Sequence, residues 1–441
     1  MSKQSSNGPA GDAAPASRAR RKLIGAAGMV AGAGVAAAAG SVAQIGASAS
    51  AQAPVGGAPP PRRQSAAAAD PVPPGRISVK DYGAVGNGSA DDTAAIEKAR
   101  DAVFASRNGN GFLTHHLYFP AGIYRVTRAD ALLPKGSPGD KINGYTIEGQ
   151  GKRCSEILFD APAGGGDPYS GNLLTAHGRV RQLRVREITF RSARAGLNWM
   201  YCWSSVSGGQ SNQDFAFDDV EWRGPWNRVI GLDGDDKSNL NSEWSFNRCH
   251  LANDVVFGDA FLHSGMSPAY SQQDQFLNFW FRDCKFEYRS GTLLRFARGG
   301  YVNVYGGSWI QCNTDPNLRS VFFDLPPGPH NNTVKTLLVC GVRFELRSRA
   351  SKLMDCGWDA RNANLSFIAC TDAALAHSAE VSAGCYPVTY RPRNGDMPFV
   401  KWQSCQLMGN HESYATANRE RLVFEQCNTL NASMEQFVVQ R

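Results

Sequence analysis

The chain has 441 residues, 42% of them hydrophobic and 19% charged, and its 46 Lys and Arg residues outnumber 39 Asp and Glu residues to give a formal net charge of +7. This composition excludes a wholly disordered chain and provides enough apolar residues for a large core. The length indicates about two or three domains, unless a repetitive fold continues through the chain as a single unit.

The surplus positive charge lies mainly at the N-terminus. Residues 1–75 contain seven basic and two acidic residues, which leaves 39 basic and 37 acidic residues for 76–441. Because the remainder of the chain is almost neutral, it lacks the basic surface that a nucleic-acid-binding protein needs. We therefore expect no nucleic-acid partner.

Residues 1–53 have the features of an export signal. The pair Arg20-Arg21, followed by Lys22, resembles a twin-arginine signal, and alternate alanines up to Ala53 suit a signal-peptidase site. The stretch between them is too rich in glycine for a confident spanning helix, so we expect no stable membrane span after signal removal. We predict a periplasmic or secreted bacterial protein; the alternatives are an uncleaved membrane anchor and a disordered basic tail.

Residues 54–75 form a second segment, rich in Pro and Ala, which includes the run Pro59-Pro60-Pro61. This composition is typical of a semi-rigid linker. We expect the folded domain to occupy residues 76–441.

An eight-residue pattern then repeats along the chain: apolar, any, apolar, any, any, small or apolar, any, apolar. Alternation predicts strands, and the two-residue gap predicts a bend between them. Equivalent positions lie 22 to 35 residues apart, which leaves room for loops of variable length. This pattern predicts a solenoid of β-coils stacked about 4.8 Å apart. The sixth position is occupied by Ile188, Val220, Cys249, Cys284, Gly307, Val342, Cys370, Cys405 and Cys427.

Five of the eleven cysteines share that sixth position. The odd number and wide scatter of the cysteines argue against a compact disulfide framework. We interpret the five as a stack of small buried apolar side chains rather than as a metal or redox site.

A second strand follows several of these repeats. If its central apolar residue points inward, period-two alternation turns the next residue outward. Two glycines in the outward set would then leave a depression beside a cation and two carboxylates. The inward set is Ile230, Phe257, Leu294, Phe323 and Met354, and the outward set is Gly231, Gly258, Arg295, Asp324 and Asp355.

The segment from Val79 to Ile96, with the sequence VKDYGAVGNGSADDTAAI, closely resembles the opening segment of the pectate-lyase-like superfamily, which includes polygalacturonase-related and tailspike-type proteins. Residues 117–124 and 145–151 resemble the next two strands of that superfamily. The resemblance implies an all-β fold: one right-handed parallel β-helix with an N-terminal capping helix, whose start Asp91 or Asp92 can cap. It also implies an exported carbohydrate-related protein, and tailspike-like relatives make a trimer conceivable.

The reaction stays open at this point. The motif set of polygalacturonases is absent, with Gly234-Asp235-Asp236 as a fragment only. The Asp-Pro-His-Asp motif of alginate epimerases is also missing, because Asp315-Pro316 continues with Asn317-Leu318.

The outward column supplies the candidate site. Asp324 and Asp355 on neighbouring rungs can serve as the two carboxyl groups of a glycoside hydrolase, with Arg295 holding the carboxylate of an acidic substrate. In a polysaccharide lyase, Asp324, Asp355 and Asp259 can instead bind Ca²⁺, the one cofactor we consider. The alternative is an Arg–Asp ladder that only solvates the sheet.

Further residues are predicted to contact substrate near this column: Arg298 and Asp259, together with His263, which can act as an acid or base. Candidate sugar-stacking side chains are Trp222, Trp226, Tyr270 and Tyr288. We therefore predict a protein that cleaves an acidic polysaccharide, as a lyase or hydrolase, in a groove along the solenoid. The competing hypothesis is a non-catalytic polysaccharide-binding or adhesion β-helix.

Overall fold

A computed structural model describes residues 74–136, 141–164, 170–205, 211–235, 241–267, 276–327, 335–358, 363–372, 387–390, 397–429 and 432–440. The predicted export segment and all but the last two residues of the predicted linker lie outside these residues, so both stay predictions. None of the helices in the described part has the length and apolarity needed to cross a bilayer.

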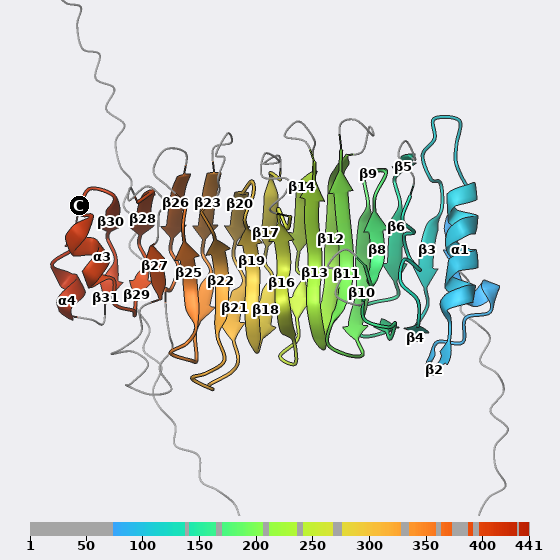
Figure 1. Ribbon diagram of the computed structural model, residues 1–441, viewed down its shortest axis with the longest axis horizontal. Helices are drawn as coiled ribbons and strands as arrows, with labels where there is room; N and C mark the ends of the chain where they lie inside the picture. Colours follow the sequence, from blue (N-terminus) through green and yellow to red (C-terminus); the bar gives the residue numbers. More distant parts are fainter. Residues whose placement is uncertain are drawn as a thin grey trace, which may run out of the picture. The chain divides into compact units, whose positions relative to one another are not determined.

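One face of the domain is a parallel sheet in which each strand pairs with the strand of the coil before it and the strand of the coil after it (Figure 1). We call it the eight-stranded sheet, after its strands in the described residues. Its strands are β8 (Asn172–Ala176), β11 (Leu197–Ser204), β13 (Pro225–Gly234), β16 (Val256–Ser264), β19 (Ser290–Phe296), β22 (Ser320–Leu325), β25 (Lys352–Cys356) and β27 (Val388–Tyr390).

The rest of each coil lies in a second, larger parallel sheet, which consists of two stacks that merge in the long strands β10 (Arg184–Ser192) and β12 (Asn212–Arg223). Around those two strands, the first stack contains β1 (Arg76–Ser78), β3 (His116–Phe119), β6 (Thr146–Gly149), β14 (Asn241–Asn247), β17 (Phe279–Arg282), β20 (Tyr301–Tyr305), β23 (Lys335–Cys340), β26 (Ala363–Ile368), β28 (Phe399–Gln403), β30 (Leu422–Glu425) and β32 (Val438–Val439). The second contains β2 (Asn87–Asp91), β4 (Gly122–Val126), β7 (Ser155–Phe159), β15 (His250–Leu251), β18 (Lys285–Tyr288), β21 (Ser308–Gln311) and β24 (Arg343–Glu345). Short pairs are made by β5 (Lys141–Asn143) with β9 (Arg179–Arg181), and by β29 (Gln406–Leu407) with β31 (Asn428–Thr429).

The predicted bend between the two stacks is present. The residue just before the sixth position of the pattern takes a left-handed backbone conformation, with φ of 53° at Asp219, 49° at Arg248 and 51° at Asp283. This conformation is costly for a residue with a side chain. Its N–H compensates by bonding to the next coil, as when Asp283 donates to the Tyr305 carbonyl at 2.9 Å.

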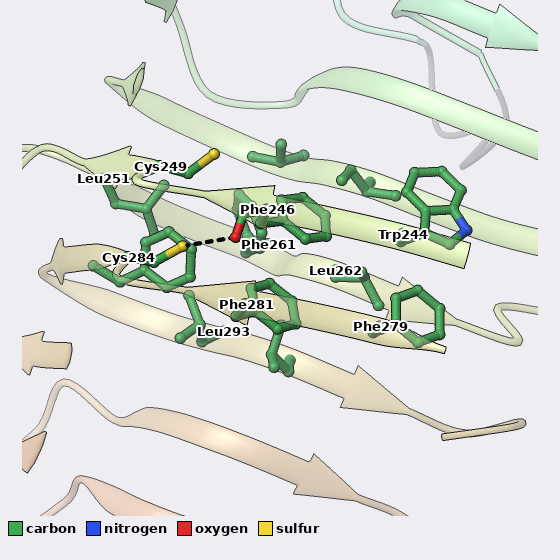
Figure 2. Packing of buried hydrophobic residues seen from close by; sticks show 14 of the residues in the cluster. Trp244, Phe246, Cys249, Leu251, Phe261, Leu262, Phe279, Phe281, Cys284 and Leu293 are labelled. Atoms are coloured by element: carbon green, nitrogen blue, oxygen red, sulfur yellow. Dashed lines mark hydrogen bonds between the residues drawn. The ribbon is translucent and has the colours of Figure 1, made fainter. Parts of the chain in front are cut away.

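Rows of equivalent side chains fill the interior. Phe246 stacks on Phe217 with ring centroids 4.8 Å apart and on Phe281 at 4.6 Å (Figure 2). Each coil thus buries its apolar residues against the coils on both sides, which confirms the predicted parallel β-helix.

The five cysteines at the sixth position are all buried, as predicted. Each thiol donates to the carbonyl oxygen of the third-position residue one coil earlier; Cys284 Sγ, for example, lies 3.4 Å from the Phe246 oxygen (Figure 2). The same bond recurs from Cys249 to Phe217, Cys370 to Val339, Cys405 to Phe367 and Cys427 to Trp402. These thiols therefore have a structural role at the bend.

Helices cover the two ends of the solenoid (Figure 1). At the N-terminal end, the 3-10 turn η1 (Val79–Tyr82) precedes α1 (Thr93–Ala105), which buries Ile96 and Val103. The Asp91 carboxylate accepts from the Thr93 N–H at 3.0 Å, and the Asp92 carboxylate accepts from the Val85 N–H at 2.6 Å. The predicted capping helix is thus confirmed. At the C-terminal end lie α3 (Glu412–Ala417) and α4 (Ala432–Glu435).

The thiol stack generates a prediction about cysteine reactivity. In the native protein, a maleimide should label the exposed Cys154 rapidly, whereas the five stacked cysteines should react only after unfolding. The reason is that burial keeps the reagent away from all five thiols. At Cys249, burial also raises the pKa well above its ordinary value, and the thiolate is the reactive form. Peptide mapping by mass spectrometry measures each site, with Cys154→Ser as the control. Fast labelling of the stack in the native protein would contradict the assignment.

Candidate functional site

The outward positions of the eight-stranded sheet form one continuous column. Each member is the direct register partner of the next, from β8 to β27. The preceding residues on the same strands, such as Leu262 and Leu294, point inward and are fully buried. We call this set the outward column: Thr175, Tyr201, Gly231, His263, Arg295, Asp324, Asp355 and Thr389.

This column corrects the predicted one at a single rung. The sequence pattern assigned Phe257 inward and Gly258 outward on β16, but Leu262 and His263 occupy those places. The cause is the length of β16: the pattern used its first residues, where Phe257 pairs with Trp226, whereas the rung lies near its end at Ser264. A β-bulge between Val256 and Ala260 also shifts the register relative to both neighbouring strands. His263 therefore lies beside Arg295.

The predicted depression beside Gly231 and Gly258 is also absent. A Cβ atom at Gly231 would overlap the guanidinium of Arg228 and the sulfur of Met266, and one at Gly258 would lie 2.8 Å from Asn227 Oδ1. Neighbouring side chains thus fill the space that each glycine leaves open.

A β-bulge changes the direction of the side chains that it contains, and the bulge in β16 contains Asp259. It accepts hydrogen bonds from His263 Nδ1 at 2.9 and 3.1 Å and from Arg295 Nη1 at 2.7 Å. Arg228 Nη1, on the preceding strand, lies 3.4 Å from its second oxygen. We call Asp259, His263, Arg295 and Arg228 the Asp259 cluster.

Charge compensation governs this cluster. Burial alone would raise the pKa of Asp259, but the hydrogen bond from His263 and the charges of Arg228 and Arg295 outweigh it and lower that pKa. The carboxylate is therefore ionised at neutral pH. Arg228 is only 1% exposed, so it depends on a nearby carboxylate to offset its loss of hydration.

The two predicted catalytic carboxylates follow Arg295 in the column. Arg295 Nε donates to Asp324 Oδ2 at 2.8 Å, and Arg319 Nη2 donates to Asp355 Oδ2 at 2.8 Å. Asp324 and Asp355 are direct register partners, about one strand spacing or 4.8 Å apart in backbone. The structure thus brings Asp324, Asp355, Arg295, Asp259 and His263 together.

Arg298 has a different environment. It follows β19, is 7% exposed, and its side chain packs where a Cβ atom at Gly265 would lie. Its Nη1 donates to the Ala297 carbonyl at 2.8 Å. The predicted substrate contact by Arg298 therefore stays a prediction.

The candidate Ca²⁺ ligands already form ion pairs with arginine side chains. Asp259 and Asp324 are both bonded to Arg295, and Asp355 is bonded to Arg319. Among the residues that the structure describes, no group of three or more His, Cys, Asp or Glu side chains is arranged to hold a metal ion. In this arrangement the donor set does not fit Ca²⁺, and we derive no step through that ion.

Sequence reasoning missed two members of the site, Arg228 and Tyr201. Extending the outward alternation to residues 197–204 would have found Tyr201, which pairs with Thr175 and Gly231. Of the predicted sugar-stacking residues, Trp222, Trp226 and Tyr288 are fully buried core residues, and Tyr270 lies outside the described residues.

The fold defines the protein as a parallel β-helix protein with a polar column on one sheet. Residues 76–286 match the family model described as rhamnogalacturonase A/epimerase, pectate lyase-like. This match confirms the resemblance of the opening segment to pectate-lyase-like proteins and extends it to residue 286.

Curated relatives match over short stretches. Mannuronan C5-epimerase AlgE4 of Azotobacter vinelandii is 32% identical over 122 residues, and AlgE5 of the same organism is 50% identical over 106. These matches cover 26% and 23% of this chain, but only 20% and 9% of the relatives. The solved A-module of AlgE4 superposes with a TM-score of 0.39 at 16% identity, over 82% of this chain and 93% of that chain.

The Asp259 cluster generates a prediction about stability. Asp259→Asn should lower the free energy of unfolding by about 2–3 kcal/mol at neutral pH, because it leaves the buried Arg228 without its carboxylate. Since the folded-state pKa of Asp259 is lowered, its contribution is full at neutral pH and is lost as the pH falls through that pKa, below about 4. The difference in the free energy of unfolding between the variant and the parent protein should therefore become smaller at acidic pH.

Urea unfolding at several pH values measures the difference in the free energy of unfolding between Asp259→Asn and the parent protein. The matched control is Asp254→Asn in the same coil, because Asp254 is half exposed and lies 3.8 Å from Arg223. Equal, small effects of both substitutions at neutral pH would contradict the compensating role of Asp259.

Proposed function

We propose that the protein acts on an acidic polysaccharide by removing the proton next to a uronate carboxylate, with His263 as the base and Arg295 as the cation that faces that carboxylate. The observation that carries this proposal is that a single carboxylate, Asp259, holds His263 and Arg295 on neighbouring rungs of one sheet face. Support for the substrate class comes from the stretches similar to mannuronan C5-epimerases and from the matched rhamnogalacturonase A/epimerase family.

The geometry suits His263 to the role of a base. Asp259 accepts from Nδ1, which favours the tautomer with the lone pair on Nε2. An acidic residue that orients a histidine in this way is a recurring arrangement in catalysis. The His263 side chain is 15% exposed, so its ring is partly accessible from the sheet face.

Arg295 meets the second requirement, stabilisation of developing charge. When the C5–H bond breaks, the proton moves to His263 Nε2 and the electron pair moves into the substrate carboxylate, where the guanidinium stabilises it. Arg295 is 30% exposed and is held at both edges by Asp259 and Asp324. In the proposed reaction, Asp324 is therefore a positioning residue for Arg295.

Two outcomes follow from the same intermediate. If the electron pair returns to form a C4=C5 double bond while the C4–O bond breaks, and the leaving oxygen takes the proton from His263 or from water, the reaction is that of a lyase. If water gives a proton to C5 from the opposite face, and His263 releases its proton to solvent, the reaction is that of an epimerase. Hydrolysis fits less well, because Asp324 and Asp355 each accept a guanidinium hydrogen bond and neither is set up to donate a proton.

The test is incubation with polymannuronate, polyguluronate and polygalacturonate in deuterated water. A lyase should give ultraviolet absorbance from unsaturated ends, whereas an epimerase should give deuterium at C5 together with C5 inversion, both detected by NMR. His263→Gln should reduce the rate about a hundredfold or more, because a positioned general base contributes that much. Arg295→Lys should also reduce it, since lysine cannot bridge two carboxylates in the same fork geometry.

The matched control is His116→Gln. His116 also pairs with a carboxylate, Glu148, at 3.1 Å, but it lies in the larger sheet, so its replacement should leave the rate unchanged. New reducing ends without ultraviolet absorbance from unsaturated ends would show a hydrolase, and binding without any product would show a non-catalytic β-helix; either result would overturn the proposed reaction.

We also propose that residues 1–53 direct export to the periplasm or beyond, supported by the resemblance of Arg20-Arg21 to a twin-arginine signal. Replacing both arginines with lysine in the full chain should leave the protein in the cytoplasm of a bacterial host, because this signal is read at its paired arginines. Cell fractionation measures the outcome, with Arg62→Lys/Arg63→Lys in the linker as the control. Normal export of the Arg20/Arg21 variant would contradict the proposal.

A further inference from the structure

A cavity of about 410 Å³ lies beside the N-terminal strands of the eight-stranded sheet. Its volume falls within the range of small-molecule sites. One wall is the segment 129–135, and the other consists of outward side chains at β8 and β11. Its charged and aromatic lining residues are Asp130, Lys135, His177, Tyr201 and Trp203.

The wall segment is firmly held in place. Its backbone bonds to β8, from the Asp130 N–H to the Asn172 carbonyl at 2.8 Å and from the Thr175 N–H to the Leu133 carbonyl at 2.8 Å. Arg100 on the capping helix α1 donates to the carbonyl oxygens of Asp130 and Ala131 at 3.2 and 2.7 Å. The cavity is thus a preformed feature of the fold.

Two stacked rings form its aromatic side. The His177 and Trp203 rings lie 6.1 Å apart at an interplanar angle of 22°, and both side chains are partly exposed. Burial, with the nearby charge of Lys135, lowers the pKa of His177, so the imidazole is neutral at pH 7. A partly exposed apolar ring surface of this kind suits the C–H face of a pyranose.

Polar groups line the opposite side. Asp130 accepts from the Thr175 hydroxyl through one oxygen, which leaves its second oxygen to accept from sugar hydroxyls. Lys135 supplies a cation that can pair with a carboxylate. Together with the ring surface, these groups match the chemistry of a uronate residue.

The cavity continues into the outward column. Thr175 and Tyr201 line it, and along the register Tyr201 is followed by Gly231 and then His263. The cavity edge and the Asp259 cluster are therefore two rungs, about 10 Å, apart on one face. A polysaccharide bound in the cavity can reach His263 without leaving the column.

We propose that this cavity is a subsite for one uronate residue of the polysaccharide, in which Trp203 stacks on the sugar ring and Lys135 binds its carboxylate, so that the chain is held in register with His263. This inference rests on the proposed function for the identity of the polysaccharide.

Calorimetry with defined oligomers of mannuronate, guluronate and galacturonate tests the subsite apart from turnover, in a His263→Gln background. Trp203→Ala should weaken binding about tenfold, as expected for the loss of one stacking platform. Lys135→Ala should weaken uronate binding by a similar factor. Trp203→Phe should bind close to the parent, which separates stacking from a folding defect. In turnover assays with His263 present, Trp203→Ala should raise KM and change kcat little.

The matched controls are Trp280→Ala and Lys285→Ala, which alter a partly exposed tryptophan and an exposed lysine of the larger sheet. If the Trp203 and Lys135 variants bind and turn over like these controls, the subsite is overturned even where the His263 reaction is found. If oligouronates bind with the predicted Trp203 and Lys135 dependence but neither unsaturated ends nor C5 exchange appear, the subsite stands and the proposed reaction fails. Tighter binding of size-matched neutral oligosaccharides would overturn the uronate assignment.

Discussion

The structure depends on the stacking of one coil on the next. A single coil has no interior of its own, so its apolar residues are buried only when equivalent residues of neighbouring coils lie directly above and below them. The Phe217, Phe246 and Phe281 row and the row of cysteine thiols show this constraint inside the solenoid. The same register aligns the outward residues, and so it assembles a polar column from residues up to 180 positions apart, from Thr175 to Asp355.

One irregularity turns that column into a site. The bulge in β16 carries Asp259 to the outer face, where it bonds His263 and Arg295 of the column and lies near the buried Arg228. The ordering of a base and a cation around one ionised carboxylate is therefore a consequence of a local departure from the repeat.

The sequence predicts the regular parts of this arrangement well. The eight-residue pattern predicts the bends, the buried thiols and the rungs of Arg295, Asp324 and Asp355, because each depends on alternation within one strand. Alternation does not show where a long strand such as β16 ends, so it assigned Gly258, near the start of that strand, to the rung that His263 occupies. It also missed Trp203, because residues 197–204 are mostly apolar, and their two polar residues, Asn198 and Ser204, are buried and do not mark the outward side. Ion pairs between coils, such as Arg319 with Asp355, depend on loop geometry that one sequence does not specify.

A crystal structure of the protein with a bound oligouronate is the most direct measurement of the central claim that the outward column is the polysaccharide site. The account predicts that the sugar chain lies on the eight-stranded sheet, with one residue against Trp203 and a carboxylate facing Arg295 within hydrogen-bond distance. Binding of the oligosaccharide on the larger sheet, or on the eight-stranded sheet without contact to Arg295 or His263, would contradict it.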